Sequence, residues 1–188
     1  MNVEKPPTIK IFDNQEITSL NTAIGVGINP EINMTKLRYH RVVIMTDADV
    51  EGAYIRILML TFFFRYMLPL IEQGHVFIAQ PPLHKFSTVK MVKYAYSDEE
   101  LENFKKNTNN ARNTLQLYKR LGEMNPGQLW ETTMDPTNRI LLKVTIDDAI
   151  HADKQFSFLM GADVGPWKEF ISKKILMPNL LIGVYYVY

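Results

Sequence analysis

The amino-acid sequence predicts an α/β fold, a Rossmann-like parallel sheet flanked by helices, followed by a smaller α+β region. Two short β-branched runs carry this prediction: residues 41–45 (RVVIM) and 75–79 (HVFIA). Residues 53–72 between them are apolar almost all round, as expected of a helix that packs against a sheet in the core. A strand, a long helix and a second strand make a βαβ unit, whose strands pair in parallel with a right-handed crossover.

The segments before this unit are predicted from turn residues and helical spacing. Residues 1–12 are polar and contain two consecutive prolines, so we expect an arm rather than a core element. Residues 14–24 place three aliphatic side chains at helical spacing, and Gly25 and Gly27 then end the predicted helix.

After the second strand the chain alternates between short strands and helices. Residues 83–96 alternate loosely and predict a hairpin. Ser97, followed three residues later by Glu100, is typical of a capping box at the start of a helix. The remaining predicted elements are a strand at 115–118, a helix that opens at Asn125-Pro126, a strand at 140–146 and an amphipathic helix at 147–160.

The composition excludes several classes of protein. The 188 residues include no cysteine, which excludes disulfide scaffolds, thiolate zinc sites and cysteine nucleophiles. A formal net charge of +1 argues against a basic surface over the whole chain but not against a local one. No uncharged apolar run reaches the roughly 20 residues of a membrane-spanning helix, and the first residues lack a signal peptide's apolar core. We therefore expect a cytoplasmic protein without a membrane partner.

An acidic turn, residues 46–52 (TDADVEG), follows the first predicted strand. Side chains of an extended segment alternate, so Asp47, Asp49 and Glu51 can point to one side at the carboxyl end of a parallel strand, where α/β sheets bind ligands. Carboxylates held this close repel one another, and a hard cation such as Mg²⁺ relieves the repulsion. The alternative is a solvated acidic loop that caps the next helix. The spacing alone leaves both interpretations open.

A second candidate site is the loop of residues 118–126 (YKRLGEMNP). Lys119 and Arg120 follow a predicted strand, and the backbone then turns through Gly122 into the start of a helix, which suits a phosphate. An ordinary strand-to-helix loop with solvated charges is the alternative. Four basic residues also precede the first strand: Lys36, Arg38, His40 and Arg41. They form either a patch that faces DNA or an ordinary charged surface.

Three long runs, RYHRVVIMTDADVEGAYIRILMLTFFFRYM, LIEQGHVFIAQPPL and YKRLGEMNPGQLWETTMDP, resemble the TOPRIM and tail region of the B subunits of bacterial DNA gyrases. The match extends from about residue 2 to about residue 170. It implies a TOPRIM domain in residues 1–96 that lacks its first strand, and a gyrase B tail region in residues 97–174. Residues 175–188 form an atypical apolar C-terminus, either a buried terminal strand or a truncated or out-of-frame end.

The resemblance implies part of an ATP-dependent type IIA topoisomerase that binds Mg²⁺ and DNA for double-strand cleavage and religation during negative supercoiling. In that family the partner, the gyrase A subunit, supplies the nucleophilic tyrosine in an A2B2 heterotetramer, so no tyrosine of this chain is expected to be the nucleophile. ATP is used by the family's N-terminal domain, upstream of the matching region. The alternatives are a non-catalytic fragment that binds DNA or the A subunit, the B subunit of topoisomerase IV, or a stand-alone Mg²⁺-dependent TOPRIM nuclease or primase-like protein.

Site residues are carried over from the family position by position. Asp47 and Asp49 match the first two acids of the D-x-D-x-D motif and are implied metal ligands, with Glu51 in the third position. Asn2 matches the DNA-contacting asparagine of the N-V-E-K segment. Lys119 matches the lysine of the Y-K-G-L-G-E motif, near the DNA backbone.

The chain also departs from the family pattern. Glu51 stands where the family has Asp, Tyr54 where it has His, and Arg120 where it has Gly, at a point where the backbone is expected to turn. The family's E-G-D-S-A-G-G segment, with the glutamate that completes the metal site, is expected upstream of Met1. No catalytic residue is therefore assigned within the chain, and we expect the chain alone to be inactive.

Overall fold

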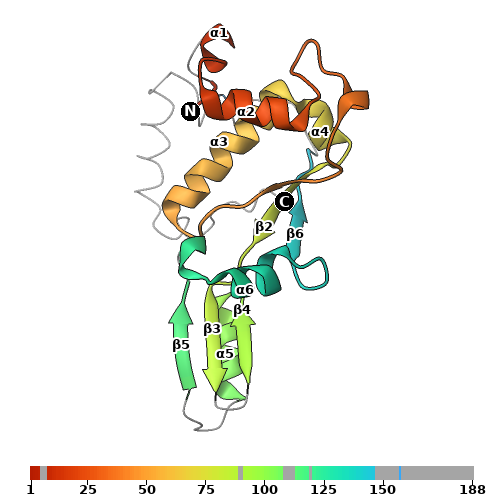
Figure 1. Cartoon of the computed structure of the whole chain (residues 1–188). Coiled ribbons are helices and arrows are strands. Elements are labelled where there is room, and N and C mark those ends of the chain that lie inside the picture. The colour runs from red at the N-terminus through yellow and green to blue at the C-terminus, as the bar shows by residue number, and fades with distance from the viewer. Residues whose placement is uncertain (5–7, 89–90, 108–112, 119, 147–156, 158–188) are drawn as a thin grey trace. The chain divides into compact units, whose positions relative to one another are not determined.

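The computed structural model describes residues 1–4, 8–88, 91–107, 113–118, 120–146 and 157 (Figure 1). The helical elements are α1 (Thr8–Ile11), α2 (Gln15–Ile24), the 3₁₀ turn η1 (Met34–Lys36), α3 (Val50–Tyr66), α4 (Leu68–Glu72), α5 (Asp98–Lys106), the 3₁₀ turn η2 (Leu121–Glu123), α6 (Pro126–Leu129) and the π-helical segment η3 (Trp130–Met134). The strands are β1 (Val42–Ile44), β2 (Val76–Gln80), β3 (His84–Thr88), β4 (Val92–Ala95), β5 (Asn113–Leu117) and β6 (Ile140–Lys143). The predicted helix at 147–160 and the apolar C-terminus at 175–188 lie outside the described residues, apart from Ser157.

The chain divides into two compact units. The first comprises residues 1–42 and 58–76 together with the chain from residue 144, and the second comprises residues 43–57 and 77–143. No helix in the described part is long and apolar enough to cross a membrane.

The core of the first unit contains α2 and the C-terminal half of α3. The α2 helix confirms the prediction for residues 14–24: the Asn14 carboxamide accepts the Ile17 N–H at 3.1 Å, and Gly25 ends the helix with φ of 87°. Because the left-handed region disfavours residues with a Cβ atom, glycine suits this position. The fully or nearly fully buried side chains of this core are Ile17, Ile24, Val26, Phe62, Phe63, Met67 and Leu70.

The N-terminal segment belongs to this core, so the expectation of an arm was wrong. Val3 is 4% exposed and Ile11 is fully buried. Between them the carboxylate of Glu4 forms an ion pair with the guanidinium of Arg65 on α3. Two apolar anchors and one ion pair therefore hold a segment whose composition is otherwise polar.

The long apolar helix predicted for residues 53–72 is two helices. α3 ends at Tyr66, and α4 begins at Leu68 with Pro69 within its first two positions. Proline has no N–H to continue the α-helical ladder but suits the start of a helix, which explains the break. The apolar surface is not uniformly covered, because Tyr54 is 54% exposed whereas residues 61–64 are buried.

One sheet has the strand order β1-β2-β6 and contains both strands of the predicted βαβ unit as neighbours. The strand predicted for residues 140–146 is β6, which is shorter than expected and pairs antiparallel with β2, with Leu141 opposite Ala79. The sheet is therefore not parallel throughout.

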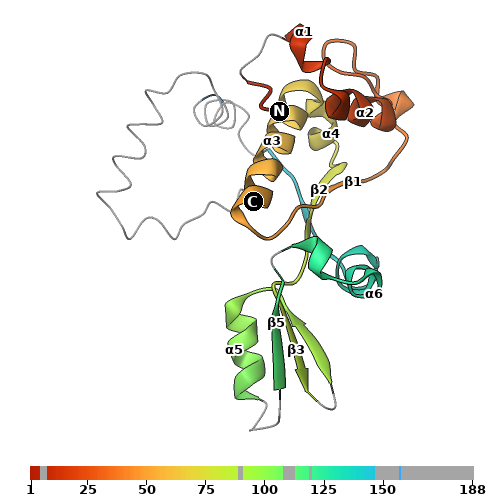
Figure 2. The same cartoon turned by 60° about the vertical axis from the view of Figure 1, so that its left-hand side comes forward.

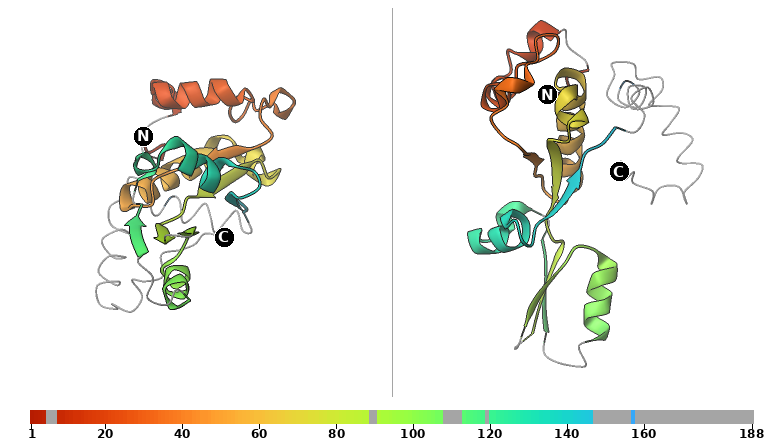
Figure 3. Two further views of the ribbon diagram at one scale, coloured as in Figure 1. Left: turned by 60° about the horizontal axis from the view of Figure 1, so that its bottom comes forward. Right: turned by 90° about the vertical axis from the view of Figure 1, so that its right-hand side faces the viewer.

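The second sheet, of order β4-β3-β5, carries α5 on one face (Figures 2 and 3). The β3–β4 pair confirms the predicted hairpin, and Phe86, Ala95 and Leu101 form the apolar contact between sheet and helix. The Ser97 hydroxyl accepts the Glu100 N–H at 3.2 Å, which confirms the predicted cap, while the Glu100 carboxylate reaches back to the Tyr96 N–H at 2.7 Å. The cap therefore fixes the point at which the chain leaves this sheet for the helix that covers it.

Candidate functional site

The acidic turn leaves the carboxyl end of β1 and enters α3. The Asp49 carboxylate oxygen Oδ1 accepts the Gly52 N–H at 2.7 Å, and the Asp49 carbonyl accepts the Ala53 N–H at 3.0 Å. Asp49 is therefore the capping residue of α3, and a carboxylate is favourable there because unpaired N–H groups and the helix dipole face it.

Gly52, at the end of the acidic turn, packs directly against the backbone of Asp47. A Cβ atom on this residue would lie 2.1 Å from the carbonyl oxygen of Asp47 and 2.9 Å from the Asp47 nitrogen. Real Cβ atoms do not approach backbone atoms this closely, so the first turn of α3 can lie against Asp47 only because residue 52 has no side chain.

The Asp47 carboxylate brings the two candidate motifs together. Its Oδ1 atom accepts the backbone N–H of Leu121 at 2.8 Å, across 74 residues of sequence. Leu121 is the first residue of the 3₁₀ turn η2. The residue before it, Arg120, does not cap this turn with its side chain. Asp47 therefore supplies the acceptor that this 3₁₀ turn would otherwise lack.

Tyr118 anchors the same loop from the other side. Its N–H donates to the Leu83 carbonyl at 2.8 Å, and its side chain is 2% exposed. Burial raises the pKa of the Tyr118 phenol, and the neighbouring Tyr94 raises this pKa further. The hydroxyl is buried without a hydrogen-bond partner in the part of the chain that the structure describes.

Arg120 occupies the position where the resemblance suggests that glycine is needed. Its backbone has φ of –125° and ψ of 144°, an extended conformation that any residue adopts. The side chain is exposed. The replacement of glycine therefore carries no backbone strain in this loop.

The implied metal ligands differ in their surroundings. Asp47 and Asp49 lie in one turn and are half-buried, whereas Glu51 is exposed on the first turn of α3. Among the described residues, no group of three histidine or acidic side chains is close enough to hold a metal ion. Asp47 and Asp49 thus lie in the same turn, and Glu51 does not join them in a three-carboxylate group among the described residues.

The donor chemistry of Asp47 and Asp49 fits Mg²⁺. Each carboxylate gives its Oδ1 atom to one backbone N–H, and its Oδ2 atom makes no hydrogen bond within the described part of the chain. Mg²⁺ binds hard oxygen donors, and one or two protein carboxylates are enough when water and phosphate supply the remaining ligands.

No third acidic side chain joins Asp47 and Asp49 in the part of the chain that the structure describes. The assignment of no catalytic residue within the chain stays a prediction.

No contact among the described residues links the acidic turn to Asn2 or Lys119, the two residues implied to contact DNA. Asn2 lies in the first unit, where its side-chain oxygen accepts the Glu4 N–H at 3.0 Å. Lys119 lies outside the described residues, although both of its chain neighbours are described.

Sequence reasoning missed Arg56 as part of this site. Its Nη2 atom donates to the hydroxyl of Thr46, the residue just before Asp47, at 3.3 Å. The available signal was a lone cation in the apolar first half of α3, a short distance after the acidic turn.

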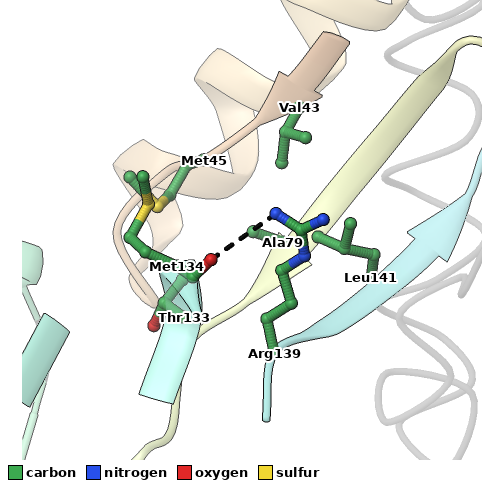
Figure 4. Close-up of a pocket in the computed structure, with 7 residues that line it drawn as sticks. All are labelled: Val43, Met45, Ala79, Thr133, Met134, Arg139 and Leu141. Atoms are coloured by element: carbon green, nitrogen blue, oxygen red, sulfur yellow. Dashed lines mark hydrogen bonds between the residues drawn. The ribbon is translucent and has the colours of Figure 1, made fainter. Parts of the chain in front are cut away.

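A small apolar pocket lies beside the β1-β2-β6 sheet, and its lining includes Met45, the residue just before the acidic turn (Figure 4). Its volume is about 140 Å³, and it is lined by Val43, Met45, Ala79, Thr133, Met134, Arg139 and Leu141. Figure 4 shows the guanidinium of Arg139 reaching back toward the Met134 carbonyl, which accepts its Nη1 donor at 3.5 Å. No sequence pattern indicated this pocket, because its lining comes from separate segments.

Comparison with known proteins agrees with the predicted fold. Residues 2–81 match the Toprim domain family, and residues 110–172 match the family described as DNA gyrase B subunit, carboxyl terminus. Residues 2–81 therefore resemble a Toprim domain, in which the acidic turn connects a strand to a helix.

Over most of its length the chain is similar to part of the DNA gyrase B subunits of several bacteria. It is 61% identical over 173 residues to the DNA gyrase B subunit of Mycoplasmoides gallisepticum, covering 92% of this chain and 27% of that protein. It is 54% identical over 175 residues to that of Clostridium acetobutylicum and 50% identical over 177 residues to that of Thermus thermophilus, in each case covering 92% of this chain and 28% of the relative. The chain thus spans between a quarter and a third of the length of these curated relatives.

We predict that Gly52→Ala destabilises the fold by about 2 kcal/mol or more, because a Cβ atom would displace the Asp47 backbone. Urea unfolding of the full chain measures the change. Gly122→Ala is the matched control: a Cβ atom there meets nothing within 4 Å, so we expect a change within about 0.5 kcal/mol. Equal effects of the two substitutions would contradict the close packing of Gly52.

Two substitutions at Asp47 should affect the loop differently. Asp47→Ala removes the acceptor for the Leu121 N–H, so we expect amide hydrogen exchange at Leu121 to accelerate about tenfold or more. Asp47→Asn retains an oxygen at the same position and should accelerate it much less. The Gly52 amide, which is bonded to Asp49, is the internal control and should change little in both variants. Unchanged exchange at Leu121 in Asp47→Ala would show that the bond does not hold the loop.

Tyr118→Phe should be neutral or stabilising by up to about 1 kcal/mol, because the deleted hydroxyl has no partner among the described residues. The raised pKa of Tyr118 means that folding favours the neutral phenol, so stability falls as the pH rises above the ordinary tyrosine value of about 10. Tyr118→Phe should make this alkaline loss shallower in unfolding curves. Tyr96→Phe is the control, because its hydroxyl donates to the Thr132 carbonyl at 3.3 Å and its loss should destabilise at neutral pH.

Proposed function

We propose that this chain is the Toprim and tail part of the B subunit of a DNA gyrase. In this proposal the chain binds Mg²⁺ and DNA for double-strand cleavage and religation, within an ATP-dependent type IIA topoisomerase that supercoils DNA negatively. The observation that carries the proposal is the bond from Asp47 to Leu121, because it joins an acidic metal turn to a basic loop suited to phosphate. The relatives reported above are named as B subunits of DNA gyrase, which favours gyrase over topoisomerase IV.

Asp47 and Asp49 would hold the cation through their Oδ2 atoms, whereas Glu51, exposed on the first turn of α3, does not join them in a three-carboxylate site among the described residues. The metal, when bound, would polarise the scissile phosphate and stabilise charge on the leaving 3′ oxygen. Asp49 also fixes the start of α3, and Gly52 keeps that helix against the turn. The two carboxylates are thus held in place before any ligand arrives, which lowers the ordering cost of binding.

DNA would be contacted by Asn2 and by the loop that contains Lys119 and Arg120. Arg120 is exposed and directly precedes Leu121, so its guanidinium extends from the loop that Asp47 holds. The nucleophilic tyrosine would come from the gyrase A subunit in an A2B2 assembly, and ATP would be used by another domain of the complete protein. The residues proposed here therefore bind and orient DNA and metal rather than form a covalent bond.

The test is Mg²⁺ binding by the full chain, measured by titration calorimetry. Asp47→Asn and Asp49→Asn each keep an oxygen for the backbone N–H but remove the negative charge, so the turn should persist while Mg²⁺ affinity falls about tenfold or more. Glu102→Gln is the control, because Glu102 is an exposed acid on α5 that pairs with Lys105. The proposal fails if the two aspartate variants bind Mg²⁺ as tightly as the unsubstituted chain.

A further inference from the structure

The geometry points to Arg56 as a positioning residue of the acidic turn. We infer that its guanidinium, through the hydroxyl of Thr46, fixes the end of the strand from which Asp47 projects, and thereby sets the affinity of the turn for a divalent cation. This inference rests on the proposed Mg²⁺ site, and it assigns a role to two residues that the metal motif does not include.

The contact ties the helix back to the strand end. Arg56 lies in the second turn of α3, and its Nη2 atom donates to Thr46 Oγ1 at 3.3 Å across ten residues of sequence. Thr46 lies between the last residue of β1 and Asp47. The turn is thus held at three successive points: Thr46 by Arg56, Asp47 by Leu121, and Asp49 by Gly52.

Arg56 forms no ion pair with the turn among the described residues. In the described part of the chain, no carboxylate lies within ion-pair distance of its guanidinium. Its Nε atom is buried without a hydrogen-bond partner there. Partial burial of a guanidinium is costly when it is not offset by charge pairing. The contact that remains is the one with Thr46, which points to a geometric role.

Charge and geometry predict opposite effects on cation binding. If Arg56 acted only through its positive charge, its removal would reduce repulsion of a cation and tighten binding. If it positions the turn, loss of its contact lets Asp47 move away from Asp49, and binding weakens because ligands must be held in place. Substitutions that keep the total charge separate the two effects.

The experiment uses the full chain and Mn²⁺, a paramagnetic cation that prefers the same oxygen ligands as Mg²⁺. Broadening of the Gly52 and Leu121 amide signals in NMR spectra, followed against Mn²⁺ concentration, gives an apparent dissociation constant at the turn. Thr46→Val removes the hydroxyl, and Arg56→Lys removes the guanidinium fork but keeps the charge. Each should weaken binding about threefold or more, and the double variant should be no weaker than the worse single variant.

Two controls separate positioning from general damage to the fold. Thr46→Ser keeps the hydroxyl and should bind Mn²⁺ like the unsubstituted chain. Arg139→Lys makes the same exchange of cations in the pocket of Figure 4 and should also leave binding unchanged. If Arg56→Lys does not fold, the comparison of Thr46→Val with Thr46→Ser carries the test.

Unchanged or tighter binding by Thr46→Val would overturn the positioning role of Arg56 while leaving the proposed metal site intact. Strictly additive losses in the double variant would overturn it as well, because the two residues would then act independently. Absence of broadening at Gly52 and Leu121 in the unsubstituted chain would refute the metal site itself, and the inference with it.

Discussion

The hydrogen bond from the Leu121 N–H to the Asp47 carboxylate is the interaction on which the candidate site depends. It joins residues 74 apart in the sequence, so closing this loop costs conformational entropy that the folding of the intervening strands and helices must offset. The acceptor is a carboxylate, which makes the bond stronger than one between neutral groups. Without it, the acidic turn and the basic loop would be two unrelated surface features, and neither motif alone would indicate a shared ligand.

The capping and the metal-binding interpretations of the acidic turn are compatible. Asp49 caps α3 with one carboxylate oxygen, and Asp47 caps η2 with one of its own. Each side chain has a second oxygen that these contacts do not use. The same bonds that satisfy backbone N–H groups therefore also orient the remaining oxygens, and Gly52 makes this possible by admitting α3 against the Asp47 backbone.

Local patterns in the sequence predicted most of the elements, because β-branched runs, cap residues and proline act over a few residues. The two strands beside α3 and the cap at Ser97 are examples. Pairings between distant segments were harder to predict from the sequence. Nothing in the sequence of β6 shows that it pairs with β2. Nothing in the polar N-terminus shows that Val3 is buried. The contact between Arg56 and Thr46 was not predicted for the same reason, because it depends on the direction in which the helix leaves the turn.

The departures from the gyrase B pattern occur where they disturb the scaffold least. Glu51, Tyr54 and Arg120 are all exposed, and Arg120 adopts an extended backbone that does not need glycine. Exposed substitutions rarely change stability by much, because few packing contacts depend on them. The buried requirements of the turn, a glycine at 52 and an acceptor at 47, are both met. Tyr54 and Arg120 therefore change exposed polar groups, Glu51 keeps the negative charge on a longer side chain, and none of the three takes part in the described hydrogen bonds that hold Asp47 and Asp49.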